Sequence, residues 1–223
     1  MSRSEFTAPR PPDEPDRLAE LSCYFVLDTP AEKPFDSLTR LAARVFETPI
    51  AFVSLLDRDR QWFKARYGLS IAETPRDVAI CAYTIMSSDV MIVLDTTLDD
   101  RFAKNPFVTG PPFIRFYAGA PLRTRSGCNL GALCVADQQP RAEAPLALRE
   151  DLSDLASLAM DELELRRKIV QLEDAKMDLV HARKECEEAR IKLDKTQYRL
   201  CEAESPPPRV GGLGSWPILD RWF

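Results

Sequence analysis

An arginine and a tyrosine two positions apart form the most chemically suggestive pair in this sequence. In the run from Ile114 to Ala120, strand alternation places Arg115, Tyr117 and Gly119 on one face. A guanidinium beside a phenol can hydrogen-bond a carboxylate or a phosphate, and a glycine lets a ligand or another backbone approach closely. We interpret Arg115 and Tyr117 as a candidate anion clamp at the edge of a pocket.

Two loop arginines extend this candidate site. Arg76 and Arg101 lie in loops that we expect near the same strand end, where they would help to orient an anionic or strongly polar small molecule. Asp95 and Asp99 offer an alternative, because they could neutralise the arginines in a closed ion-pair network that admits no ligand. The sequence leaves both interpretations open.

Six cysteines add candidate thiol chemistry without the spacing of a metal site or a disulfide framework. Cys81 opens an expected short helical segment at 80–86, and Tyr83 follows two residues later; both are candidate ligand contacts. The sequence has no CxxC pair and one histidine, so we predict free thiols and no metal site. A buried, inert thiol is the favoured interpretation of Cys81, Cys128 and Cys134.

Composition excludes several functional classes. The 223 residues are 45% hydrophobic and carry a formal net charge of −5, which leaves room for one globular domain with accessory segments. Without a surplus of lysine and arginine, a general nucleic-acid binder is not expected. Apolar runs are strand-sized and the first 15 residues lack the apolar core of a signal peptide, so we expect a cytoplasmic protein without a membrane segment.

The elements that must position these residues are helices and strands. Helical spacing of apolar residues predicts short helices at 17–23 and 35–46, the second lying across a sheet. Trp62, in the clearest hairpin, is either cover for the sheet or a plate on which a ligand stacks. Strands are expected at 50–56, 61–67, 90–94, 114–120 and 130–137.

From residue 145 the sequence changes to one long helix with a heptad repeat. About 50 residues at 1.5 Å each give a helix of roughly 75 Å, which is longer than this domain can cover, so we predict a parallel homodimer. Lys168 and Cys186 weaken the predicted seam, because both stand where an apolar residue is favoured. The residues assigned to dimerisation are Leu158, Leu165, Leu172, Leu179, Leu193 and Leu200.

Several motifs in order resemble the bacterial-type GAF sensory domains that precede diguanylate cyclase or histidine kinase outputs. The likeness extends from Arg17 to Arg167 and is carried by DRDRQWFKARYGL (57–69), ETPRDVAICAYTI (73–85), DRFAKNPFVTGPPFIRFYAGAPL (100–122) and GALCVADQQP (131–140). The resemblance implies an α+β fold: a central antiparallel sheet flanked by helices, a ligand-sized cavity under the loops between the second and fourth strands, and a C-terminal helix that enters a dimeric coil.

Composition, the heptad pattern and this resemblance together divide the chain into four expected parts. We expect a disordered N-terminal arm at 1–15, a GAF-like sensory domain at 16–144, a signalling helix or coiled coil at 145–203, and a disordered Pro/Gly-rich tail at 204–223.

Departures from the family pattern bear on the ligand. Relatives of this subtype often carry a histidine two residues after the Cys81 position, where this chain has Tyr83, and bilin-binding members have one directly after the cysteine, where it has Ala82. A bilin is therefore disfavoured. The signature of cyclic-nucleotide-binding members is not intact, so a cyclic nucleotide stays open and the cofactor unassigned.

Three functions follow from these expectations. The leading one is a non-catalytic sensory module that relays occupancy of its pocket through the paired coil to a downstream signalling protein; no catalytic output sequence is visible. The runner-up is a thiol enzyme like the GAF subfamily that reduces free methionine sulfoxide, because Cys81 lies in a comparable loop region. The third is a coiled-coil scaffold with a vestigial GAF domain, which a blocked cavity would favour.

Overall fold

The structure, a computed structural model, describes residues 6–144 and 146–204. Its backbone divides into two compact units, Met1–Gln171 and Leu172–Phe223, and the second is helical over its described part. Residues 205–223 of the predicted tail lie outside the described residues, as do the first five residues of the predicted arm, whereas Glu204 is the last residue of the long C-terminal helix. Among the described helices, none combines the length and the apolar character that crossing a membrane requires.

Six antiparallel strands form one sheet in the order β3-β2-β1-β6-β5-β4. The first two strands, β1 (Ile50–Leu56) and β2 (Arg60–Tyr67), form the predicted hairpin, which confirms that reading. The other strands are β3 (Glu73–Pro75), β4 (Met91–Val93), β5 (Phe116–Arg123) and β6 (Asn129–Asp137). The sheet with its flanking helices is the expected α+β arrangement.

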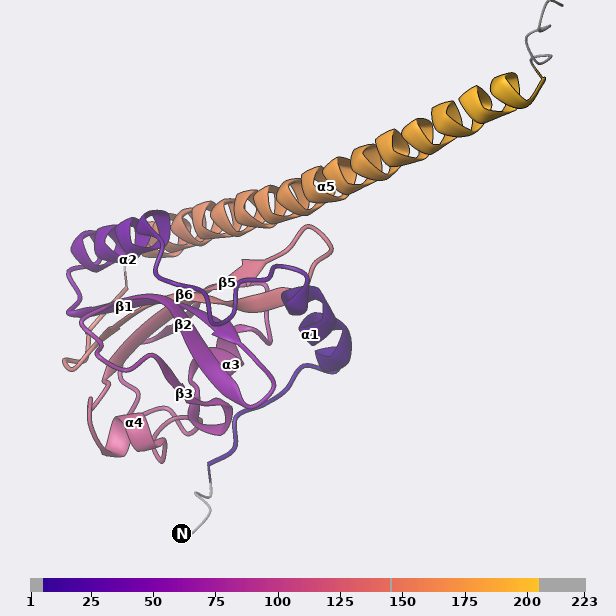
Figure 1. Ribbon diagram of the computed structural model, residues 1–223. Helices are drawn as coiled ribbons and strands as arrows, with labels where there is room; N and C mark the ends of the chain where they lie inside the picture. The colour runs from indigo at the N-terminus through magenta and orange to yellow at the C-terminus, as the bar shows by residue number, and fades with distance from the viewer. Residues whose placement is uncertain (1–5, 145, 205–223) are drawn as a thin grey trace, which may run out of the picture. The chain divides into compact units, whose positions relative to one another are not determined.

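Helices cover both faces of the sheet. Helix α2 (Lys33–Val45) and the first turns of α5 (Leu146–Glu204) pack on one face, while α3 (Cys81–Thr84) and α4 (Pro106–Thr109) lie on the other (Figure 1). A further helix, α1 (Glu14–Ser22), precedes them, and a 3₁₀ turn, Arg76–Val78, follows β3. Both faces of β1 and β6 are therefore buried.

Strand alternation divides the buried side chains between two cores. We call the one under α2 and α5 the helix-side core and the one under α3 and α4 the cavity-side core. In β1, Ala51, Val53 and Leu55 belong to the helix-side core, and Ile50 and Phe52 belong to the cavity-side core.

In β5 the predicted alternation holds within the strand and fails before it. Phe116, Ala118 and Ala120 face the helix-side core and Tyr117 faces the cavity-side core. Alternation through the whole predicted strand 114–120 would put Ile114 on the same face as Phe116, but Ile114 packs in the cavity-side core. The reason is that β5 begins at Phe116, and the backbone N–H of Ile114 bonds to the carbonyl of Phe107 in the preceding turn at 2.8 Å.

The first turns of α5 complete the helix-side core. Leu148, Leu152, Ala159 and Leu163 are buried there, so the core continues past the boundary expected after residue 144. These residues recur at helical spacing and cover the sheet as an apolar stripe.

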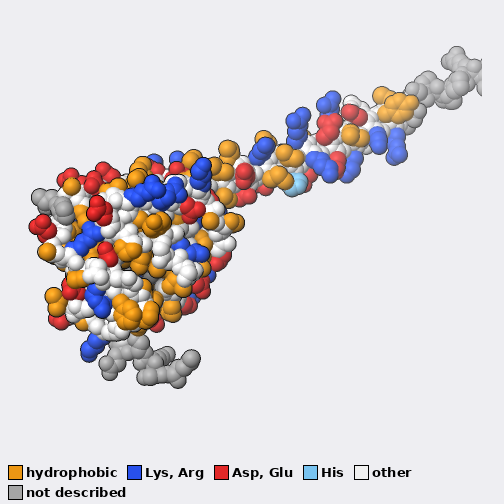
Figure 2. Space-filling view, turned by 90° about the vertical axis from the view of Figure 1, so that its left-hand side faces the viewer, with side chains coloured by type: hydrophobic (Ala, Val, Ile, Leu, Met, Phe, Trp, Pro, Cys, Tyr) orange, Lys and Arg blue, Asp and Glu red, His pale blue; other side chains and the backbone are white. Residues whose placement is uncertain are grey.

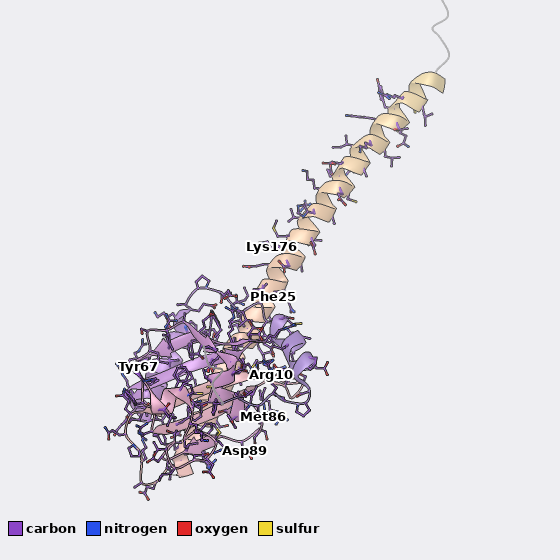
Figure 3. The ribbon with its side chains drawn as sticks, turned by 90° about the horizontal axis from the view of Figure 1, so that it is seen from below. Arg10, Phe25, Tyr67, Met86, Asp89 and Lys176 are labelled. Atoms are coloured by element: carbon purple, nitrogen blue, oxygen red, sulfur yellow. The ribbon has the colours of Figure 1, made fainter. Side chains whose placement is uncertain are left out.

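Part of the predicted disordered arm is ordered against the domain. Ala8 is buried in the cavity-side core, and its backbone N–H donates to the carbonyl of Asp77 at 2.9 Å. Arg10, labelled in Figure 3, lies 3.8 Å from a carboxylate oxygen of Asp59. The prediction of disorder for the whole arm, which rested on its proline content, was therefore too broad, because Ala8 of the arm packs in the core.

Exposed apolar side chains on the first unit are scattered. Phe25, Tyr67 and Met86 are each about half exposed, and Figure 3 shows them at separate places on the surface. Along α5, apolar and charged side chains interleave on the exposed surface (Figure 2).

Candidate functional site

A small cavity of about 50 Å³ opens within the cavity-side core. It lies under the segment that follows β2 and against α3, which is the region that the family resemblance indicated. Its described lining carries no charged side chain, and most of the lining residues are apolar. The lining residues are Phe52, Gln61, Phe63, Leu69, Ile71, Thr74, Ile80, Cys81, Phe107, Pro112, Ile114 and Tyr117.

Two buried thiols and a buried phenol meet at the polar end of this cavity. The Sγ atoms of Cys81 and Cys134 are 3.4 Å apart, and the Tyr117 hydroxyl lies 3.3 Å from the first and 3.0 Å from the second. Gln61 Nε2 donates to Cys81 Sγ at 3.0 Å, and Thr84 Oγ1 lies 2.8 Å from the Tyr117 hydroxyl. We call Cys81, Cys134 and Tyr117 the thiol cluster.

The cluster shifts the pKa values of its two thiols in opposite directions. Burial tends to raise the pKa of Cys81, but hydrogen bonds from Cys134, Tyr117, Ser54 and Gln61 together bring that pKa below its ordinary value. Burial, followed by the neighbouring Cys81, raises the pKa of Cys134 well above its ordinary value. Of the two thiols, Cys81 is therefore the one that ionises more readily.

Gly119 makes room for the phenol. A Cβ atom at this position would lie 2.5 Å from the Tyr117 hydroxyl and 2.9 Å from Thr84 Oγ1. The close approach expected at Gly119 is therefore made by the strand's own tyrosine, whose ring lies along β5. At Gly131 a Cβ atom would lie 1.9 Å from the Ser54 carbonyl oxygen, so this position of β6 has no room for a side chain.

Two of the seven predicted ligand contacts line the cavity: Cys81 and Tyr117. Tyr83 packs edge-on against Phe102, with ring centroids 4.9 Å apart. Trp62 belongs to the opposite, helix-side core, because its position in β2 faces α2. Its reading as sheet cover holds, and its reading as a plate for ligand stacking does not fit this cavity.

The three predicted arginines have other partners. Arg115 Nη1 donates to the carbonyls of Val108 and Ile114, at 2.9 and 3.0 Å. Arg101 is about half exposed and pairs with Asp99 at 2.6 Å, as the alternative interpretation allowed. The anion clamp expected from the sequence is therefore not assembled at this cavity, because Arg115 precedes β5 and its guanidinium holds the turn before the strand.

Arg76, in the 3₁₀ turn after β3, joins a buried ion-pair group whose other members, Glu14 and Arg17, lie on α1. Its side chain is almost fully buried; Nη2 lies 3.2 Å from a Glu14 carboxylate oxygen, and Nη1 donates to the Asp57 carbonyl at 2.7 Å. Arg17 shares the same carboxylate at 2.7 Å. Burial, then the neighbouring Arg17, lowers the pKa of Arg76 to about 10. The role of Arg76 is thus to fasten α1.

Sequence reasoning missed Cys134, Gln61 and Thr84 as members of this site. A signal for Cys134 existed in the parity of β6, where Ala132, Cys134 and Ala136 share the cavity-side core. The strand register then brings Cys134 beside the site, since Cys134 pairs with Gly119 in the neighbouring β5. Within the described residues, no group of three or more His, Cys, Asp or Glu side chains could hold a metal ion.

Comparison with known families assigns this fold. The GAF domain model matches residues 30–161, which is more than half of the chain. The chain belongs to the GAF domain family. Over 144 residues it is 49% identical to a cyclic di-GMP phosphodiesterase of Pseudomonas aeruginosa, a match that covers 65% of this chain. The chain spans about a quarter of that relative's length.

Solved structures share the fold at low sequence identity. A GAF domain from an Acinetobacter phosphoenolpyruvate-protein phosphotransferase aligns at a TM-score of 0.51 and 17% identity, over 71% of this chain and 96% of that one. The free methionine-R-sulfoxide reductase of Neisseria meningitidis aligns at a TM-score of 0.51 and 16% identity, over 76% of this chain and 99% of that one. The blue-light-absorbing form of the PixJ GAF domain of Thermosynechococcus elongatus aligns at a TM-score of 0.51 and 13% identity, over 75% of this chain and 94% of that one.

Proposed function

We propose that this chain is a non-catalytic sensory GAF module that binds a small molecule in its cavity and relays occupancy through α5. The observation that carries the proposal is an apolar cavity with one polar end, formed by Gln61, Cys81 and Tyr117. Such a site, mostly apolar with a few convergent polar groups, is typical of small-molecule recognition.

The cavity's size and lining restrict the ligand that we propose. About 50 Å³ leaves room for a few heavy atoms, whereas drug-sized or nucleotide ligands occupy pockets of about 300 Å³ or more. An anion would lose its hydration without a cation to replace it, which is costly. A neutral small molecule with a hydrogen-bonding group directed at the polar end therefore fits better than the anionic ligand expected from the sequence, and a cyclic nucleotide would require the cavity to open.

Relay through α5 rests on the continuity of this helix. Leu148 and Leu163 are buried in the helix-side core, and Leu165, further along the same helix, is about half exposed. We propose that a second copy of the chain covers the exposed seam in a parallel coiled coil. The exposed seam leucines are Leu158, Leu165, Leu172, Leu179, Leu193 and Leu200.

The proposed output is an enzyme of cyclic di-GMP metabolism. The support is the 49% identity shared with a segment of the Pseudomonas aeruginosa phosphodiesterase, of which this chain spans about a quarter. A sensory module of this kind acts by making different contacts in its occupied and empty states, and the coil passes that difference to the partner.

Native mass spectrometry of the freshly purified protein tests the ligand proposal. We expect the mass spectrum to show a small neutral molecule bound to the protein, either retained from purification or added. In thermal denaturation, the same molecule at a hundredfold excess over its Kd should raise the melting temperature by an amount equivalent to about 2.7 kcal/mol of stabilisation. Leu69→Trp should block the cavity and abolish both signals, since Leu69 lines it.

Leu98→Trp is the matched control, because Leu98 is 83% exposed and lies outside this cavity's lining. A wild-type protein that retains nothing, and that no member of a library of small neutral molecules stabilises, would contradict the ligand proposal. If such a protein were still dimeric, the scaffold alternative would replace the sensory one.

A thiol reductase is the second candidate, favoured by the 3.4 Å contact between Cys81 and Cys134. The described lining opposes it for free methionine sulfoxide, because that substrate carries an ammonium and a carboxylate and the cavity provides no charged partner for either. We expect no thioredoxin-coupled reduction of methionine sulfoxide. Robust turnover that Cys81→Ser abolishes would reverse this ranking.

A further inference from the structure

The thiol cluster lies beneath the cavity, and the sensory function proposed above requires no reactivity from it. We propose that Cys81 and Cys134 form a peroxide-sensitive dithiol: a small hydroperoxide entering the cavity oxidises Cys81, and Cys134 then closes an intramolecular disulfide. This inference does not depend on a regulatory ligand or on the coiled coil.

The separation of the two sulfur atoms is compatible with the bond. The two Sγ atoms are 3.4 Å apart and a disulfide bond is about 2.05 Å long, so the sulfurs must approach by about 1.4 Å. Cys134 is fixed in the middle of β6, whereas Cys81 stands at the start of the four-residue helix α3. A short rotation of the Cys81 side chain, with adjustment of α3, would supply the movement.

Exposure to the cavity assigns the two thiols different roles. The described lining includes Cys81 and does not include Cys134, so an oxidant in the cavity meets Cys81 first. Three groups besides Cys134 support a thiolate on Cys81: the Tyr117 hydroxyl, the Gln61 amide and Ser54. The thiolate is the form that attacks a peroxide oxygen. Cys134 is then the resolving thiol.

The proposed reaction balances with hydrogen peroxide as the oxidant. The Cys81 thiolate attacks one peroxide oxygen, the O–O bond breaks, and the departing hydroxide takes a proton to become water, which leaves a sulfenic acid on Cys81. The Cys134 sulfur then attacks the Cys81 sulfur, the S–O bond breaks, and the thiol proton leaves with the hydroxide as a second water. Two thiols are oxidised to one disulfide, and one hydrogen peroxide is reduced to two waters.

The cavity should select the oxidant by size. Its volume of about 50 Å³ accommodates a few water-sized groups, and hydrogen peroxide is of that size. Cumene hydroperoxide carries an aromatic ring, and a cavity of about 150 Å³ is needed for benzene alone. We therefore expect hydrogen peroxide to oxidise Cys81 much faster than cumene hydroperoxide does.

Peptide mapping of the full chain after treatment with hydrogen peroxide tests the proposal. The protein is treated under mild conditions, its remaining thiols are alkylated, and its peptides are identified by mass spectrometry. We expect a cross-linked pair of peptides containing Cys81 and Cys134, a loss of about 2 Da from the two thiols, and full reversal by dithiothreitol. The exposed Cys23 is the internal reference for unassisted thiol oxidation.

Variants separate the roles of the two cysteines. In Cys134→Ser, dimedone should trap a sulfenic acid on Cys81, whereas in Cys81→Ser it should leave Cys134 unlabelled. Tyr117→Phe should slow the labelling of Cys81 about tenfold, the effect expected from losing one hydrogen bond to a charged group, because the Tyr117 hydroxyl that helps to lower the pKa of this thiol is removed. Cys23→Ser should behave as the wild type.

Three results would overturn the proposal. The first is that Cys81 and Cys134 remain reduced after Cys23 is oxidised. The second is trapping on Cys134 instead of Cys81. The third is oxidation of Cys81 at equal rates by cumene hydroperoxide and by hydrogen peroxide, which would mean that the cavity is not the route of entry.

Discussion

At the scale of single residues, the site is organised by one glycine. Gly119 leaves a space on β5 that the Tyr117 ring fills, and the hydroxyl consequently reaches Thr84, Cys81 and Cys134. The phenol is fully buried, and burial raises its pKa well above the ordinary value, so it remains a hydrogen-bond donor. The polar end of the cavity therefore depends on a missing side chain as much as on those present.

Gly119→Ala should displace the phenol, because the added methyl group would lie 2.5 Å from the Tyr117 hydroxyl. We expect a loss of about 1–3 kcal/mol in the free energy of unfolding, measured by urea denaturation. In the Tyr117→Phe background the same substitution should cost less, since the closest clashing atom is absent. An equal cost in both backgrounds would show that Tyr117 is not what occupies this space.

Arg115 is a second residue whose role the structure reassigns. Arg115→Ala removes two hydrogen bonds to the carbonyls of Val108 and Ile114, and we expect a loss of about 1–2 kcal/mol with ligand-induced stabilisation retained. Arg101→Ala is the control, because its exposed pair with Asp99 contributes less than about 1 kcal/mol. Unchanged stability together with lost ligand stabilisation would instead favour an anion clamp.

At the scale of elements, Glu32 joins three parts of the domain. It stands at the N-terminus of α2 and accepts hydrogen bonds from Lys64 of β2 and from Arg166 of α5, the latter at 2.9 Å. The Lys64 side chain is fully buried and also donates to Thr29 and to the Pro30 carbonyl. α5 is thereby fastened to the sheet by polar contacts in addition to its apolar stripe.

Glu32→Gln should lower the free energy of unfolding by about 1–2 kcal/mol at pH 7, since the carboxylate is partly exposed and partly screened. Burial opposes its ionisation, but hydrogen bonds from Lys64 and Arg166 and their positive charges outweigh burial and lower the pKa of Glu32 from its ordinary value. A carboxylate with a lowered folded pKa stabilises the protein above its unfolded pKa, and this contribution disappears as the pH falls through the folded pKa.

The difference between wild type and Glu32→Gln should therefore be constant from pH 7 to about pH 5 and should shrink at lower pH. Denaturation curves at several pH values measure it. A difference that grows on acidification would contradict the assigned sign.

At the scale of the whole molecule, the question is what covers the seam of α5. In the second unit, Leu172, Leu179 and Leu193 are all more than 60% exposed. Such a row of apolar side chains at seven-residue spacing is costly in water and favours association with another helix.

Leu179→Asp should convert the proposed dimer to a monomer, because it places two carboxylates at the centre of the seam. Sedimentation equilibrium at tens of micromolar measures the change. Met177→Asp is the matched control: Met177 is 56% exposed, lies off the predicted seam and undergoes the same change of charge. A monomeric wild type, or equal effects of the two substitutions, would contradict the proposed dimer.

Cys186 reports the orientation of the helices in the same experiment. It occupies the seam position and is exposed, so a parallel pair in register brings the two copies of Cys186 together. Oxidation should then give a Cys186–Cys186 cross-link between two chains. An antiparallel pair would not bring these residues together.

Local patterns in the sequence were sufficient to predict most of the helices and strands. The hairpin of β1 and β2, the parity of Phe116 to Ala120 and the long helix followed from periods of two residues, of 3.6 residues and of seven. These patterns are local, because they reflect which face of an element avoids water. The family motifs added the antiparallel sheet and the place of the cavity.

The members of the thiol cluster were decided by tertiary structure alone. Cys81 and Cys134 are 53 positions apart in sequence, and their contact depends on α3 packing over β5 and β6 in one particular register. The partners of the arginines were equally non-local, since Arg76 pairs with Glu14 of α1, 62 positions away in sequence. Sequence determined which residues could be buried, whereas packing determined which polar groups meet once they are, because a buried donor or acceptor must find its partner among whatever the fold brings within about 3 Å.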